Sequence, residues 1–120
     1  MAKILVVDDT RDVADVMVSL LQQSGHEVTV AYDGSDALLQ LSQHVPQIVF
    51  LDIGMPTMDG FEVVRRIREV HGNRVRVVAC TGYLQRLIFE KSNIAQFDAV
   101  LFKPASVDAI FKAIDGFTDK

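Results

Sequence analysis

The stretch Ile48-Val49-Phe50-Leu51-Asp52 decides the fold, because four apolar residues run without a polar interruption and end at a carboxylate. Uninterrupted apolarity over so few residues is typical of a strand buried on both faces, and such strands usually lie in parallel sheets. Residues 4–7, 75–80 and 99–102 are likewise rich in apolar residues and do not alternate regularly with polar ones. Residues 27–31 alternate more between apolar and polar, and we expect them to form a weaker strand at an edge of the sheet.

Apolar residues at helical spacing separate these blocks. The stripes lie within residues 13–21, 37–41, 61–67, 84–93 and 109–117. Residues that cap or break helices flank them: Thr10 or Asp12, Gly25, Asp33-Gly34, Pro46, Asp59-Gly60 and Ser106. A strand followed by a helix, five times over, predicts an α/β fold with a five-stranded parallel sheet covered by helices on both faces. We expect residues 1–120 to form this single domain.

Composition excludes several classes of function. The net charge of -4 makes the chain a poor general binder of nucleic acid, which needs clustered Lys and Arg. One cysteine excludes a disulfide framework within the chain. No apolar run approaches the roughly 18 residues of a membrane span, and the N-terminal run is too short for a signal peptide. A cytoplasmic domain is therefore expected.

Polar residues follow four of the predicted strands. They are Asp8-Asp9, Asp52, Thr81 and Lys103-Pro104. Each alone is most simply a helix cap, a turn former or a solvated side chain. Together they converge, because ligands in open α/β sheets bind beyond the carboxyl ends of the strands. Three clustered carboxylates repel one another unless a cation neutralises them, and hard oxygen ligands suit Mg²⁺.

A carboxylate beside Mg²⁺ can accept a phosphoryl group. Such transfer relies on positioning and charge stabilisation, with a metal, an ammonium group and a hydroxyl or N–H each placed on a phosphoryl oxygen. Asp52 ends the central strand and is the best-placed acceptor, while Lys103 and Thr81 supply the ammonium and the hydroxyl.

These residues resemble the receiver domain of two-component response regulators, the CheY-like family. The resemblance rests on Asp8-Asp9, the run from Asp52 to Gly60 (Asp-Ile-Gly-Met-Pro-Thr-Met-Asp-Gly), Thr81 and Lys103-Pro104, and it covers residues 2–117. It implies a flavodoxin-like, doubly wound (βα)5 fold with strand order 2-1-3-4-5. It also implies a signalling phosphoacceptor rather than an enzyme.

The resemblance assigns a role to each matching residue. Asp52 is expected to accept a phosphoryl group from a phosphohistidine of a histidine kinase or a phosphotransfer protein. Asp9 and Asp52 are expected to bind Mg²⁺ directly, Asp8 largely through water, and Gly54 through its carbonyl; Mn²⁺ can substitute. Lys103 would hold a phosphoryl oxygen, and its bond to Pro104 is expected to be cis. Thr81 would move toward the phosphoryl group and shift a two-state equilibrium.

Three positions either depart from the family pattern or affect how fast water removes the phosphoryl group. The switch aromatic normally lies three residues before the Lys, where this chain has Val100; Phe102 is not an obvious substitute. Gly54 offers no side chain to orient water, and Tyr83 can shield the site, so we expect slow self-dephosphorylation. The run Asp52-Ile-Gly-Met-Pro, together with Thr81-Gly82-Tyr83, is more similar to receivers of hybrid sensor kinases, which relay phosphate onward.

The stretch after Thr81 is unusually apolar. Its Leu84, Leu87, Ile88 and Phe89 span too wide an arc for all of them to face the core. A broad core face with one exposed residue is the simpler interpretation. The alternative is a surface for a homodimer or an effector, formed by residues 84–93, the strand at 99–102 and the last helix.

Other candidates and rival classes are weaker. We expect His26, His44 and His71 to be solvated, as well as the arginines of residues 65–76, and Cys80 to be a small buried residue. An FMN-binding flavodoxin would need a phosphate loop without the acidic residues 8–12. A haloacid dehalogenase-type phosphatase would need a second Asp where Gly54 stands. A pseudo-receiver, acting only as an interaction module, usually lacks an acidic or Lys position.

Overall fold

The computed structural model describes residues 1–55, 58, 60–82 and 96–118. Its centre is a five-stranded parallel sheet in the order β2-β1-β3-β4-β5. The strands are β1 (Lys3–Val7), β2 (Glu27–Ala31), β3 (Ile48–Asp52), β4 (Arg76–Thr81) and β5 (Ala99–Phe102). The parallel sheet, its strand order and the edge position of residues 27–31 are confirmed.

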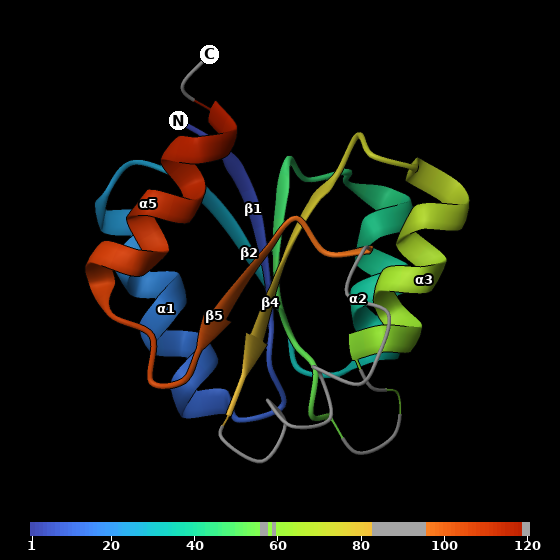
Figure 1. The fold of residues 1–120 in the computed structure, drawn as a ribbon, viewed down its shortest axis with the longest axis horizontal. Helices are drawn as coiled ribbons and strands as arrows, with labels where there is room; N and C mark the ends of the chain where they lie inside the picture. Colours follow the sequence, from blue (N-terminus) through green and yellow to red (C-terminus); the bar gives the residue numbers. More distant parts are fainter. Residues whose placement is uncertain (56–57, 59, 83–95, 119–120) are drawn as a thin grey trace.

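Helices cover both faces of the sheet, as predicted (Figure 1). They are α1 (Arg11–Gln23), α2 (Gly34–Gln43), α3 (Gly60–His71) and α5 (Val107–Thr118). Helices α1 and α5 lie on one face, and α2 and α3 lie on the other. The helix predicted over residues 84–93 lies outside the described residues. So do Pro56, Thr57, Asp59 and Tyr83. No helix in the described part of the chain could cross a membrane.

Two apolar cores result from the period of two along the strands. Alternate residues of the sheet face α1 and α5, and this core contains Ile4, Val6, Phe50, Val78, Leu21, Ile110 and Ile114. The intervening residues face α2 and α3, and that core contains Leu5, Val49, Leu51, Val77, Leu41, Val64 and Ile67. Because β3 lies in the middle and is buried throughout, its last residue, Asp52, is held at the centre of the sheet's carboxyl edge.

Residues 99–102 are less buried than their apolar sequence predicts. Strand β5 is the second edge strand, its first three residues are half-buried, and Phe102 is 47% exposed. An edge strand has a neighbour on one side only, so apolar composition alone does not ensure burial on both faces. Val13 of α1 also differs from expectation, because it is nearly half-exposed rather than in the core.

The predicted helix boundaries have clear local causes. The Asp33 carboxylate accepts a hydrogen bond from the Asp36 amide (2.7 Å) and caps α2. The Ser106 hydroxyl accepts one from the Ala109 amide (3.1 Å) and caps α5. Gly25 follows α1 with a φ of +90°, a conformation that favours glycine. Thr10 is the N-cap of α1, but its side chain makes no capping bond.

Arg68 and His26 are half-buried and hydrogen-bonded, whereas the sequence interpretation expected both to be solvated. The Arg68 guanidinium donates to the carbonyls of Gln96 and Val75 and pairs with Asp98 (2.9 Å). Nδ1 of His26 accepts a hydrogen bond from the Ala2 amide (3.0 Å). Gln96 and Asp98 lie 28 and 30 residues after Arg68, and Ala2 lies 24 residues before His26, so residue spacing does not indicate these contacts.

Candidate functional site

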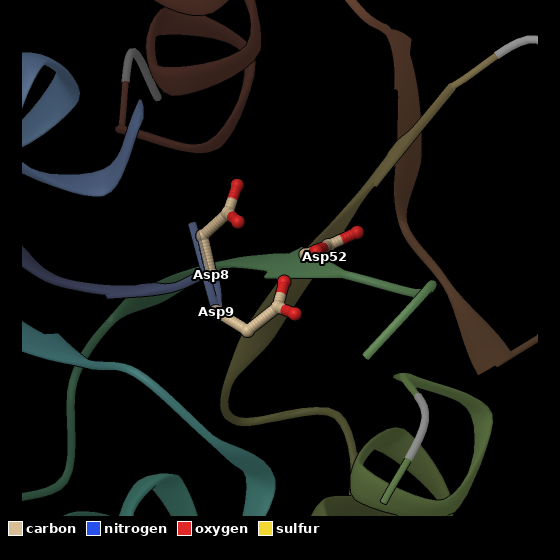
Figure 2. A group of neighbouring side chains, drawn as sticks. All are labelled: Asp8, Asp9 and Asp52. Carbon is tan, nitrogen blue, oxygen red and sulfur yellow. The ribbon is translucent and has the colours of Figure 1, made fainter. Parts of the chain in front are cut away.

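Three carboxylates meet at the carboxyl edge of the sheet (Figure 2). Asp8 and Asp9 follow β1, and Asp52 ends β3, the strand beside it. Each offers an oxygen atom within 4.8 Å of the others. The sequence prediction that these three side chains converge is therefore met by the geometry.

Asp8 is held in place from two sides. Its backbone amide donates to the carbonyl of Ala31 on β2 (3.1 Å), and its Oδ1 accepts from the Thr10 amide (2.9 Å). Its Oδ2 accepts from Nζ of Lys103 (2.9 Å). The residue is only 5% exposed. A buried carboxylate with such partners has a set orientation, and it turns one oxygen toward the lysine.

Asp52 is as deeply placed as Asp8, with 4% of its surface exposed. Its Oδ1 accepts a hydrogen bond from the Gly54 amide (3.0 Å) and lies 3.5 Å from Nζ of Lys103. Burial raises the pKa of Asp52 to about 6; the Gly54 bond and the Lys103 charge oppose this rise, and Asp8 and Asp9 add to it. Asp52 is thus mainly ionised at neutral pH but carries a cost for its charge.

Lys103 follows β5 and brings an ammonium group to this cluster. Burial alone would lower its pKa, but the hydrogen bond to Asp8 and the charge of Asp52 outweigh burial, so its pKa lies above the ordinary value. Its peptide bond to Pro104 is cis, the isomer that the sequence predicts. Among the residues that the structure describes, one cation therefore faces three carboxylates, which gives this described set a surplus of negative charge.

This surplus suits a divalent cation. The donors are all hard oxygen atoms, two of the three carboxylates are buried, and their oxygens are close enough to share one ion. The Asp52 pKa points the same way, because the folded protein holds this charge at a cost that a cation would relieve. The residues present fit Mg²⁺ by these criteria.

Thr81 and the residues around it complete the edge. Thr81 ends β4, is fully buried, and donates its hydroxyl to the carbonyl of Gly82 (3.2 Å). The Lys103 amide donates to the Thr81 carbonyl (2.7 Å), which ties the ends of β4 and β5 together.

Val100 is half-buried and packs on the core beneath α2 and α3. Cys80 is buried, and burial raises its thiol pKa to about 12.

A close backbone approach supports the loop after Asp52, and the sequence analysis did not assign it. The Gly60 amide donates to the Ile53 carbonyl (3.3 Å), and a Cβ at Gly60 would lie 2.5 Å from the Ile53 Cα. Only glycine fits here without movement of the backbone. In the sequence analysis the Asp59-Gly60 pair marks a helix start and closes the motif from Asp52 to Gly60, without this steric role.

Comparison with known proteins identifies the family. The family model described as "Response regulator receiver domain" matches residues 4–115. A curated relative is the "Uncharacterized 14.6 kDa protein in sodA1 3'region" of Leptolyngbya boryana; it is 36% identical over 102 residues, which are 84% of this chain and 78% of that protein.

Solved structures agree with this fold. Response regulator protein TrrA from Thermotoga maritima, solved in complex with Mg(2+)-BeF, is 26% identical with a TM-score of 0.86, covering 98% of this chain and 99% of that one. The receiver domain of NtrX from Brucella abortus is 28% identical with a TM-score of 0.86, covering 98% of both chains. A longer NtrX chain from Brucella abortus, solved in complex with ATP, is 29% identical with a TM-score of 0.87. The match covers 98% of this chain but only 27% of the NtrX chain.

Proposed function

The chain belongs to the response regulator receiver domain family, and from this premise we propose that Asp52 is a phosphoacceptor in a two-component phosphorelay. The donor is a phosphohistidine of a histidine kinase or of a histidine phosphotransfer protein. The phosphorus–nitrogen bond of the donor breaks, a phosphorus–oxygen bond to the Asp52 carboxylate forms, and the imidazole leaves. Residues 1–120 act as one receiver domain, in the cytoplasm where such donors are found.

The surroundings of Asp52 carry this proposal. The carboxylate lies at the end of the central strand, its Oδ1 is oriented by the Gly54 amide, and an ammonium group lies 3.5 Å away. With a pKa of about 6, Asp52 is mainly a carboxylate at neutral pH, the form that attacks phosphorus. Burial withholds the solvation that would weaken its nucleophilicity in water.

Lys103 and Thr81 have the chemistry to hold the transferred group. The Lys103 ammonium lies between Asp8 and Asp52 and can donate to a phosphoryl oxygen bonded to Asp52. The Thr81 hydroxyl, now bonded to the Gly82 carbonyl, can exchange that weak contact for a phosphoryl oxygen. Asp8, Asp9, Asp52 and the Gly54 carbonyl would hold Mg²⁺. Bound there, Mg²⁺ supplies positive charge against the carboxylates and the phosphoryl oxygens.

Movement at Thr81 offers a route for output. Because the Lys103 amide is bonded to the Thr81 carbonyl, a shift of the β4 end is passed to the end of β5. We expect the signal to leave through β5, α5 and residues 84–93, toward an effector or a second copy. Val100 lacks the ring that usually couples this movement, so the coupling here rests on the strand ends themselves.

The test is chemical phosphorylation. The protein is incubated with acetyl phosphate and Mg²⁺, and its intact mass is measured. Wild type should gain one phosphoryl group, Asp52→Asn should gain none, and Asp12→Asn should behave as wild type. Asp12 is a matched control because it belongs to the same acidic stretch but lies outside the carboxylate cluster. Phosphorylation that persists in Asp52→Asn would overturn the assignment. An unlabelled wild type would favour the pseudo-receiver.

The lifetime of the phosphorylated form is a second test. Gly54 has no side chain to orient a water molecule toward phosphorus, so we expect a lifetime of minutes to hours in Mg²⁺ buffer. Gly54→Asn adds an amide that can hydrogen-bond water, and it should shorten the lifetime. The decay of the phosphorylated mass after removal of acetyl phosphate measures both. Decay of wild type within seconds would contradict slow self-dephosphorylation.

A further inference from the structure

A cavity of about 420 Å³ opens between α1 and the start of α5, behind the carboxylate cluster. One wall is the inner side of α1, represented by Ala14 and Met17, and the other includes Ala105 and Ile110. Phe50 and Cys80 of the sheet form its floor. Helices α1 and α5 lie beside each other on this face of the sheet in Figure 1.

Among the lining residues that the structure describes, each charged side chain has a partner of opposite charge. The two charged residues are Asp8 and Lys103, and they are bonded to each other at 2.9 Å. The remaining lining residues are apolar or, in Cys80, a buried thiol. An ionic ligand would have to lose its hydration without gaining a free partner, whereas an uncharged apolar molecule has no such hydration to lose and gains from burial of its surface.

The size and the mouth of the cavity also favour a small molecule. A cavity of about 150 Å³ with apolar walls accommodates benzene, and ligand sites usually measure about 300–1,000 Å³. Val16 at the rim is 69% exposed, and its neighbours Val13 and Val107 are nearly half-exposed. An apolar rim around an apolar interior gives an uncharged ligand a continuous path inward.

We propose that this cavity is a binding site for an uncharged, apolar molecule with two or three aromatic rings. The molecule would pack between α1 and the loop that carries Pro104 and Ala105, in contact with the wall formed by Asp8 and Lys103. The cavity shares Asp8 and Lys103 with the carboxylate cluster, but binding to it goes beyond the phosphoacceptor function proposed above and requires neither Mg²⁺ nor phosphorylation.

The test uses N-phenyl-1-naphthylamine, an uncharged probe whose fluorescence rises in apolar surroundings. It is titrated into the full chain without Mg²⁺ or a phosphodonor. We expect saturable binding to wild type and a dissociation constant at least about tenfold larger in Val16→Lys, which places a charge at the rim. Val70→Lys is the matched control, because Val70 of α3 is 68% exposed and lies on the other face of the sheet.

A second variant tests the interior of the cavity. Ala105→Leu adds apolar volume inside the cavity without adding a charge, and it should also weaken the probe about tenfold. Circular dichroism establishes that each variant is folded. Loss of affinity in Val16→Lys and Ala105→Leu, with Val70→Lys within about twofold of wild type, supports the site. Absence of saturable binding, or equal affinity in all four proteins, overturns it. If the probe fails but Val16→Lys slows phosphotransfer from a donor protein, the cavity is a protein-docking feature instead.

Discussion

At the scale of single residues, the burial of Asp52 destabilises the folded protein but suits the residue for its proposed function. The fold buries a carboxylate beside two others, and within the described residues the Lys103 ammonium group compensates only part of the charge. Burial raises the pKa of Asp52 to about 6, so the fold destabilises this charge, as is common for carboxylates at functional sites. The same burial that makes Asp52 costly in the resting protein makes it a strong candidate for accepting a phosphoryl group.

We therefore predict that Asp52→Asn stabilises the protein above pH 6 in the absence of Mg²⁺. The pKa of Asp52 is higher in the folded state than its ordinary 3.8, so the unfolded chain loses this proton first as pH rises. The free energy of unfolding of wild type falls between about pH 4 and 6, and the variant escapes this loss. After allowance for screening, the gain at pH 7 is on the order of 1–2 kcal/mol.

Urea denaturation at pH 7 and at pH 4 measures this difference. The advantage of the variant should be largest at pH 7 and should shrink at pH 4, where folded wild type holds the proton and the unfolded chain is close to half protonated. Asp12→Asn, at an exposed carboxylate of α1, should shift the free energy of unfolding by less than about 0.5 kcal/mol. A variant that is no more stable than wild type at pH 7 would contradict the cost assigned to the Asp52 charge.

Gly60 illustrates a residue whose role is purely steric. Gly60→Ala would place a Cβ against the Ile53 backbone, which cannot turn aside as a flexible side chain can. We expect a loss of about 1–3 kcal/mol in the free energy of unfolding. Phosphorylation should also slow, because the displaced residue, Ile53, directly follows Asp52. Gly116→Ala in α5 is the control: a Cβ there meets nothing within 4 Å, and alanine favours a helix. Equal effects of the two substitutions on unfolding would refute the steric role.

At the scale of elements, sequence periodicity predicted the strands and most helix ends because both follow from local chemistry. Residues 48–52 are apolar because β3 is covered on both faces, and Gly25 ends α1 because it tolerates a positive φ. The exposure of β5 was not predictable in this way, since the order of strands decides which one lies at the edge. The carboxylate cluster was predictable, because the carboxyl ends of adjacent parallel strands lie at the same edge of a sheet and bring the residues that follow them together.

The Arg68 network shows what periodicity cannot supply. Arg68 lies on α3 at a spacing typical of a solvated face, yet its guanidinium joins α3 to the start of β4 and to the residues before β5. The same Asp98 carboxylate that pairs with Arg68 also accepts from the Val77 amide (2.8 Å). Such a contact depends on the path of the chain between residues 68 and 98, which no local pattern encodes.

We predict that Arg68→Gln lowers the free energy of unfolding by about 2–4 kcal/mol. The substitution removes donors from buried carbonyls and leaves the half-buried Asp98 with fewer partners. Arg65→Gln is the control, because Arg65 pairs with Glu62 and Glu69 on the exposed face of the same helix, and it should cost less than about 1 kcal/mol. Chemical denaturation of the two variants decides the matter. Similar losses would mean that Arg68 is no more than a surface arginine.

At the scale of the whole molecule, the candidate site is where distant parts of the chain are joined. Lys103 and Asp8 are 95 residues apart and bonded at 2.9 Å, and Asp52 comes from the middle of the sequence. Unfolding separates all of these groups. A ligand that binds their folded arrangement therefore stabilises the entire fold, by an amount that grows with its concentration over its dissociation constant.

Mg²⁺ should accordingly raise the thermal midpoint of wild type. At a concentration about 100 times the dissociation constant, the expected gain is about 2.7 kcal/mol in the free energy of unfolding. Asp9→Asn should lose most of this gain, because it removes a carboxylate of the cluster that is exposed and so contributes little to the fold by itself. Asp12→Asn, outside the cluster, should keep the gain in full. Thermal unfolding is compared in MgCl₂ and in NaCl of equal ionic strength, so that general screening cancels. If Asp9→Asn responds to Mg²⁺ as strongly as wild type, the ion acts elsewhere on the molecule and the carboxylate cluster is not its site.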